Sequence, residues 1–229
     1  MLNIELEITL RCNASCPQCS RHCNIFSYGH SDMTMEQINK FINEVVLSSV
    51  PVRKIMIIGG EPTVHPQFQE IVFSLYESLL KTRKIQMLKI TTNSLREIPG
   101  DILSLPIGVT RSPLSDKKHR CQFVAPRDTG QEIQTCKAPD VCGIALNCYG
   151  YSPCGAGAAI IRLLNMKNLI HYKLPSGPGD FGDLTELCSL CQASAREPRI
   201  YGIDDCTPSR SFLEAIDKYK KNRPHYKLY

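Results

Sequence analysis

The stretch LNIELEITLRCNASCPQC, residues 2–19, decides the expected fold of this chain. Its first half alternates apolar and polar residues, a pattern typical of a strand. Glu5 and Glu7 would then face either a polar interior or the solvent at a sheet edge. Its second half places Cys12, Cys16 and Cys19 in a C-x3-C-x2-C array directly after that strand. Three thiolates on one short loop can each bind one iron of a cubane, which leaves the fourth iron open for a ligand and for chemistry.

The next hundred residues alternate helical and strand patterns. A Thr34-x-x-Gln37 capping box predicts the start of the first helix, which ends before Pro51. The later elements expected are a strand over residues 54–58 ending in Gly59-Gly60-Glu61-Pro62, a helix from Pro66, a strand over 86–92 and a strand over 107–110. This order predicts a parallel α/β sheet, in which ligands bind at the C-terminal ends of the strands.

Cysteine content is the second unusual feature, with 12 cysteines in 229 residues. The N-terminus lacks the basic flank and apolar run of a signal peptide, and no apolar stretch reaches the ~20 residues that a membrane helix needs. We therefore expect a cytoplasmic chain with reduced thiols, in which so many cysteines indicate metal rather than disulfides. The net charge of +5 suits an anionic substrate or cofactor and is too small to argue for nucleic acid.

From about residue 113 the regular alternation of helices and strands stops. Cys142 and Cys154 flank an expected hairpin, and Cys188 and Cys191 form a C-x2-C pair. Their spacing is consistent with a second metal site. The rival ligands are Cys121, Cys136 and Cys148. A zinc-stapled mini-domain and buried thiols without a metal are the alternatives for these cysteines.

Three features together resemble the radical S-adenosylmethionine (SAM) superfamily over roughly residues 2–112. They are the three cysteines of the first loop, the Gly59-Gly60-Glu61-Pro62 run and Thr92-Asn93-Ser94. The resemblance implies a partial (β/α) barrel. Only three or four of about six βα units are visible, so either the barrel is abbreviated or further strands lie within residues 107–165. Two residues depart from the family pattern: Gln18, where an aromatic often stands, and Ser94, where a glycine often follows the asparagine.

The resemblance also implies roles for the site residues. Cys12, Cys16 and Cys19 would hold a [4Fe–4S] cluster whose open iron binds SAM. The cofactor contacts would come from Gly59, Gly60, Glu61, Pro62, Asn93 and Ser112, with Glu61 fixing the loop and Ser112 a candidate for the ribose. Reductive cleavage of SAM would yield a 5′-deoxyadenosyl radical that takes a hydrogen atom from the substrate.

The downstream cysteines resemble the auxiliary-cluster extensions, of SPASM or twitch type, that follow many radical SAM cores. That implies a second [4Fe–4S] cluster, held by Cys142, Cys154, Cys188 and Cys191. Cys23 and Cys206 are left over. Either of them, with Cys206 preferred, is a candidate to return a hydrogen atom to a substrate radical, as a cysteine does in some epimerases of the superfamily.

The expected organisation is a core over residues 1–112, with an outer limit near residue 165, a Cys-rich extension over 113–208, and a C-terminal helix with a basic tail over 209–229. The expected function is hydrogen abstraction from a peptide or small natural product, leading to epimerisation, oxidation or rearrangement. A flavodoxin or ferredoxin would be the reductant, with no membrane or nucleic-acid partner. The alternative is a non-catalytic iron–sulfur or zinc protein for electron transfer or binding, which would not bind SAM.

Overall fold

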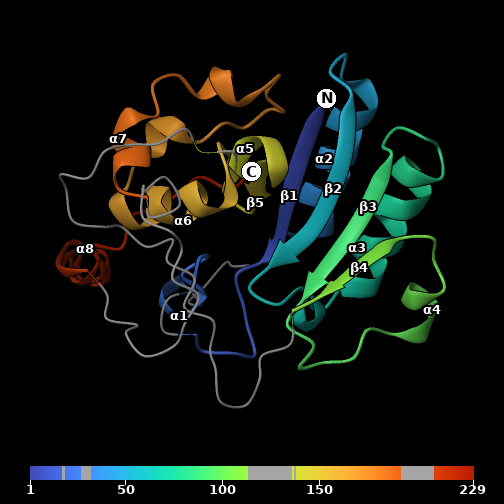
Figure 1. Ribbon diagram of the computed structural model, residues 1–229, viewed down its shortest axis with the longest axis horizontal. Coiled ribbons are helices and arrows are strands. Elements are labelled where there is room, and N and C mark those ends of the chain that lie inside the picture. The colour runs from blue at the N-terminus through green and yellow to red at the C-terminus, as the bar shows by residue number, and fades with distance from the viewer. Residues whose placement is uncertain (17–18, 27–31, 113–135, 137, 192–208) are drawn as a thin grey trace.

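A computed structural model describes residues 1–16, 19–26, 32–112, 136, 138–191 and 209–229, and the expectations for Cys121, Cys206 and Gln18 lie outside these residues. One six-stranded sheet in the order β4-β3-β2-β1-β5-β6 forms the centre (Figure 1). Its strands are β1 (Leu2–Thr9), β2 (Val52–Gly59), β3 (Met87–Thr92), β4 (Gly108–Arg111), β5 (Ile144–Asn147) and β6 (Gly150–Ser152). The strands from β1 to β5 run parallel and β6 is antiparallel, so the described sheet is mixed and open at β4 and β6.

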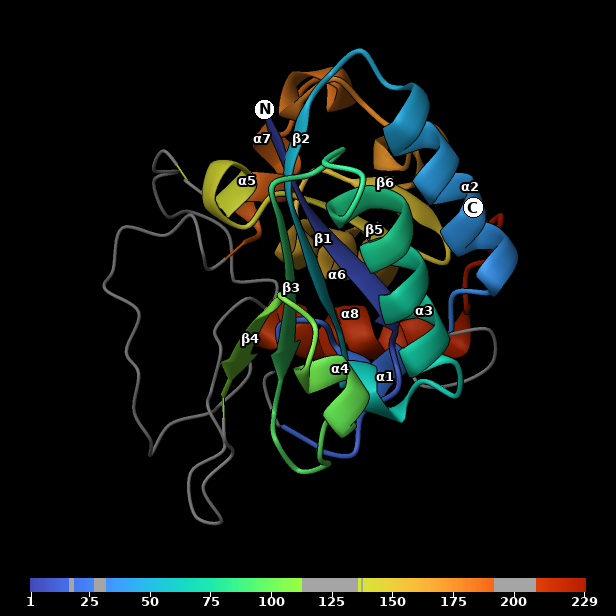
Figure 2. The same cartoon turned by 90° about the vertical axis from the view of Figure 1, so that its right-hand side faces the viewer.

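Helices cover both faces of this sheet. The α-helices are α1 (Cys23–Phe26), α2 (Met35–Leu47), α3 (Phe68–Leu75), α4 (Gly100–Leu103), α5 (Ala138–Val141), α6 (Gly155–Leu164), α7 (Thr185–Ser189) and α8 (Arg210–Lys221). Short turns of other helix types are η1 (Pro62–Val64), η2 (Tyr76–Leu80), η3 (Lys167–Leu169) and η4 (Pro178–Phe181). Figure 2 shows α2 and α3 side by side on one face. No helix in the described part of the chain is long and apolar enough to cross a membrane.

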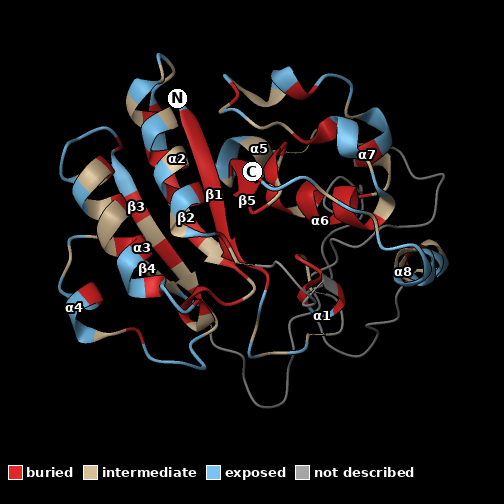
Figure 3. Ribbon diagram, turned by 180° about the vertical axis from the view of Figure 1, so that it is seen from behind, coloured by how far each residue is buried: buried red, intermediate tan, exposed pale blue. Residues whose placement is uncertain are grey.

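The central strand β1 is buried on both faces, as Figure 3 shows along its whole length. Its apolar residues, such as Ile4 and Leu6, belong to the main core with Phe41 of α2 and Ile71 of α3. The opposite face carries Glu5 and Glu7, at 3% and 0% exposure. The expectation of a polar interior is therefore confirmed, and the alternative of carboxylates in solvent is wrong.

The expected hairpin after Cys142 is confirmed, and it joins the main sheet. Strand β5 pairs in parallel with β1, and β6 returns antiparallel to β5. The sheet therefore includes residues well beyond 112, and it brings the start of α6 onto the polar face of β1. A separate Cys-rich extension is not evident in the described residues, because these strands complete the central sheet.

The capping box at the start of α2 is also confirmed. The Thr34 hydroxyl accepts a hydrogen bond from the Gln37 backbone at 3.2 Å, and the Gln37 side chain accepts one from the Thr34 backbone at 3.0 Å. The Gln37 amide also donates to the Cys148 carbonyl at 3.0 Å. Local capping and a tertiary contact thus depend on the same two residues.

Replacing Thr34 with alanine should lower the free energy of unfolding by about 1 kcal/mol, because the first turn of α2 loses its side-chain cap. Urea unfolding followed by circular dichroism measures the change. Thr34→Ser keeps the hydroxyl and should stay close to the parent chain. Equal stabilities for the alanine and serine variants would contradict the capping role.

Candidate functional site

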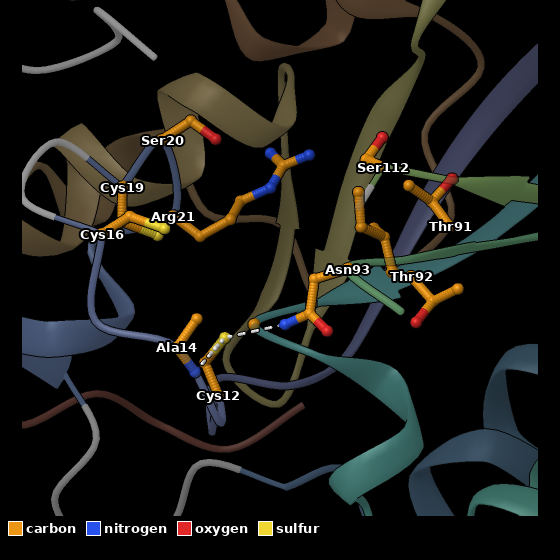
Figure 4. Close-up of a pocket in the computed structure, with 13 residues that line it drawn as sticks. Cys12, Ala14, Cys16, Cys19, Ser20, Arg21, Thr91, Thr92, Asn93 and Ser112 are labelled. Atoms are coloured by element: carbon orange, nitrogen blue, oxygen red, sulfur yellow. Dashed lines mark hydrogen bonds between the residues drawn. The ribbon is translucent and has the colours of Figure 1, made fainter. Parts of the chain in front are cut away.

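The C-terminal ends of four neighbouring strands surround one cavity of about 180 Å³ (Figure 4). The lining residues are Cys12, Ala14, Cys16, Cys19, Ser20, Arg21, Ile58, Gly59, Gly60, Thr91, Thr92, Asn93 and Ser112. The structure therefore brings together the three cysteines of the first loop, the paired glycines, Asn93 and Ser112, which are far apart in the sequence. Glu61 and Pro62, expected to contact the cofactor, are not among the lining residues.

Close backbone packing explains the paired glycines. A Cβ at Gly59 would lie 2.2 Å from the Thr9 carbonyl oxygen, and one at Gly60 would lie 2.2 Å from that of Arg11. The Gly60 and Glu61 amides donate to these same two carbonyls, each at 2.9 Å. Any side chain here would push the cysteine loop away from the end of β2.

Glu61 is a clamp between the ends of β2 and β3, and its side chain is fully buried. One carboxylate oxygen accepts from the amide and hydroxyl of Thr63, at 3.1 and 2.8 Å, and from the Thr92 hydroxyl at 2.9 Å. The other oxygen accepts from the Asn93 amide at 2.7 Å. In this structure Glu61 acts on the site by holding the loop that carries Asn93.

Asn93 reaches from the end of β3 to the cysteine loop. Its side-chain nitrogen donates to the Asn13 side-chain oxygen at 2.8 Å. The same nitrogen lies 3.8 Å from the Cys12 sulfur, a contact that the dashed line in Figure 4 marks. The next residue, Ser94, has a φ of +65°, a backbone region that favours glycine. The departure from the family pattern at Ser94 therefore falls on a position with a real backbone demand.

The three thiols of the first loop differ in their surroundings. Burial raises the pKa of Cys12 to about 11 and also raises the pKa of Cys16. A hydrogen bond with Cys23, aided by the nearby Arg21 charge, lowers the pKa of Cys19 to about 6. Cys23, left over in the sequence, is thus buried directly beside this loop.

The three thiols line one cavity. Each thiolate of a [4Fe–4S] cluster binds a different iron, so three cysteines around one cavity fit such a cluster.

Sequence reasoning missed Arg21, which lines the cavity. Its guanidinium donates to Glu5 at 2.8 Å and lies 3.2 Å from Glu7. A usable signal was present, because two carboxylates on a strand buried on both faces require cationic partners. Which arginine supplies the charge could not be read from the pattern.

The downstream cysteines gather around the first turn of α6. Cys154 is its N-cap, and its sulfur accepts from the Gly157 amide at 3.3 Å. Burial raises the pKa of Cys154, and the nearby Cys191 and Cys136 raise it further. Burial and the nearby Cys136 likewise raise the pKa of Cys188. These cysteines therefore influence one another electrostatically.

Cys148 lies elsewhere, 1% exposed in the main core, and burial raises its pKa to about 12. The Cys142 amide donates to the Ala138 carbonyl at 2.8 Å, at the end of α5. Cys136, a rival ligand in the sequence, raises the pKa of both Cys154 and Cys188.

Comparison with known proteins agrees with this geometry. Residues 6–104 match the family model described as the Radical SAM superfamily, so a Radical SAM domain is found in this part of the chain. The match contains the cysteine loop, the paired glycines and Asn93.

Two curated relatives are both called "Probable GTP 3',8-cyclase". The protein of Pyrococcus horikoshii is 33% identical over 70 residues, covering 31% of this chain and 21% of the relative. The protein of Methanococcus maripaludis is 31% identical over 93 residues, covering 41% and 29%. The alignments thus span less than a third of either relative.

One solved structure, described as the crystal structure of BtrN in complex with AdoMet and 2-DOIA, is similar over 84% of this chain and 93% of that chain. The TM-score is 0.49 and the sequence identity is 13%.

Glu61→Gln should lower the free energy of unfolding by about 1–3 kcal/mol, because its new NH2 group would face a buried donor. Urea unfolding measures this loss. Glu97→Gln changes an exposed carboxylate after the same strand and should stay within about 0.5 kcal/mol of the parent chain. A Glu61 variant as stable as the Glu97 control would show that the clamp is dispensable.

Proposed function

We propose that this chain is a radical SAM enzyme that cleaves SAM reductively and abstracts a hydrogen atom from a peptide or small-molecule substrate. One observation supports this most directly: three thiols, two close-packed glycines, Asn93 and Ser112 line a single cavity at the strand ends. A simple electron carrier has no need for the last two groups beside its cluster.

In this proposal each lining group has its own task. Cys12, Cys16 and Cys19 hold the cluster, which when bound supplies the electron for SAM cleavage. Asn93 and Ser112 present polar groups to SAM from the ends of β3 and β4. Gly59 and Gly60 allow the cysteine loop to lie against β2, and Glu61 keeps Asn93 in place.

The proposed substrate class is broader than the single substrate, GTP, that the names of the two relatives give. Both relatives are called GTP cyclases, but the aligned segments cover 21% and 29% of their lengths. The likeness therefore supports shared use of SAM rather than a shared substrate. Epimerisation, oxidation and rearrangement of a peptide or natural product all begin with the same abstraction step.

We further propose an auxiliary [4Fe–4S] cluster held by Cys142, Cys154, Cys188 and Cys191, with Cys136 as a rival to Cys142. The packing of α6 on α7 supports this, because the Gly157 position lies beside both the Cys154 sulfur and Leu187. The Cys191 amide also donates to the Cys188 carbonyl at 3.2 Å, which closes a turn between the two cysteines of the C-x2-C pair. Cys136 is a rival because it raises the pKa of both Cys154 and Cys188.

A small flavodoxin or ferredoxin is the proposed electron donor. Support comes from the net charge of +5, since flavodoxins and ferredoxins are commonly acidic and charge complementarity speeds association.

The chain should be reconstituted anaerobically with iron and sulfide, then given SAM and dithionite and assayed for 5′-deoxyadenosine. We expect product with the parent chain and none with Cys12→Ala, because the cluster loses a ligand. Cys148→Ala, which removes a core thiol instead, should keep both cluster and product. A loaded cluster whose EPR signal does not respond to SAM would overturn the enzyme proposal in favour of electron transfer.

The auxiliary cluster predicts about eight irons per chain, against about four for one cluster. Cys142→Ala should reduce the iron count by about half, while Cys148→Ala, which removes a core thiol, leaves it near the parent value. Colorimetric iron analysis and Mössbauer spectra measure both. If Cys136→Ala loses iron and Cys142→Ala does not, Cys136 is the ligand instead.

A further inference from the structure

Arg21 connects two parts of the molecule that are far apart in sequence. It follows Cys19 by two residues and lines the same cavity, and Figure 4 shows its side chain leaving the loop beside Cys19 and Ser20. Its side chain is only 10% exposed. Burying a charged side chain costs free energy unless the charge is paired, so the partners of Arg21 are the next question.

Both the side chain and the backbone carbonyl of Arg21 are held by other elements. The guanidinium pairs with Glu5 at 2.8 Å and Glu7 at 3.2 Å, both on the polar face of β1. Arg162 of α6 pairs with Glu7 at 3.4 Å and donates to the Arg21 carbonyl at 3.3 Å. Asn147 of β5 also donates to Glu7, at 2.9 Å. The positive charges of two arginines thus balance the negative charges of two glutamates. Because of these contacts, Arg21 cannot move independently of β1 and α6.

The first turn of α6 is built directly against this guanidinium. A Cβ at Gly155 would lie 1.5 Å from an Arg21 nitrogen and 2.1 Å from a Glu5 oxygen. The residue before it is Cys154, the N-cap of α6. Arg21 therefore lies between the loop that carries Cys19 and the turn that carries Cys154.

Arg21 carries its charge in this position, because a guanidinium stays protonated at any ordinary pH and two carboxylates lie beside it. A buried ion pair is weak support for stability, since removing both partners often costs little. Its retention here suggests a role for the charge itself.

We propose that Arg21 is a positioning residue that fixes the Cys12–Cys19 loop against β1 and α6 and places a positive charge beside the cluster-binding thiols. The proposal rests on the function proposed above. A reduced cluster carries more negative charge than an oxidised one, so a nearby cation favours reduction. Arg21 thereby raises the reduction potential of the N-terminal cluster.

The test is an EPR-monitored redox titration of the reconstituted full chain. Arg21→Gln should shift the potential of the N-terminal cluster to more negative values, while Arg21→Lys, which keeps the charge, should stay nearer to the parent. Arg111→Gln is the matched control, because it removes an equal charge from the exposed end of β4 and should leave the potential unchanged.

A second variant covers the case of a folding defect. Arg21→Gln leaves Glu5 buried without its partner, so Arg21→Gln with Glu5→Gln removes the pair together. The double variant should fold, as judged by circular dichroism. It also removes the negative charge of Glu5, but Arg21 lines the cavity and Glu5 does not, so it should show a smaller negative shift than Arg21→Gln alone. A folded variant that binds no cluster, while Arg21→Lys does, also supports the positioning role.

Two results would overturn the proposal in different ways. Full iron loading with an unchanged potential in the folded variants would reject the role of Arg21 and leave the proposed function standing. A parent chain that binds no cluster would reject both.

Discussion

The Glu61 carboxylate accepts hydrogen bonds from Thr63, Thr92 and Asn93 in a place that water does not reach. A buried carboxylate is tolerated only when its oxygens are satisfied, so the ends of β2 and β3 must stay together. The position of Asn93 beside Cys12 follows from this clamp. The cavity at the strand ends therefore depends on a residue that does not line it.

The two faces of β1 divide the molecule into a stable core and a charged interior. The apolar face packs with α2 and α3, as any parallel α/β sheet requires. The polar face holds Glu5 and Glu7, which Arg21 and Arg162 neutralise from the cysteine loop and from α6. Because each charge needs its partner, the loop, the central strand and the following helix are fixed relative to one another.

Much of the fold could be predicted because its signals are local. The Thr34–Gln37 capping box, the alternation in β1 and the hairpin of β5 and β6 each depend on residues only a few positions apart. The pairing of β5 with β1 could not be predicted, since it joins residues about 140 positions apart across a segment without a regular pattern. That pairing places α6 on the polar face of β1.

The sequence by itself determined the cysteine loop, the paired glycines and the asparagine after β3, because spacing along the chain is what places three thiols on one short loop after a strand. Only the tertiary structure decided which groups meet from a distance, such as Glu61 with Thr92 and Arg21 with Glu5. The physical reason is that buried charges and thiols select partners by packing in three dimensions, and the sequence pattern records the demand for a partner but not its identity.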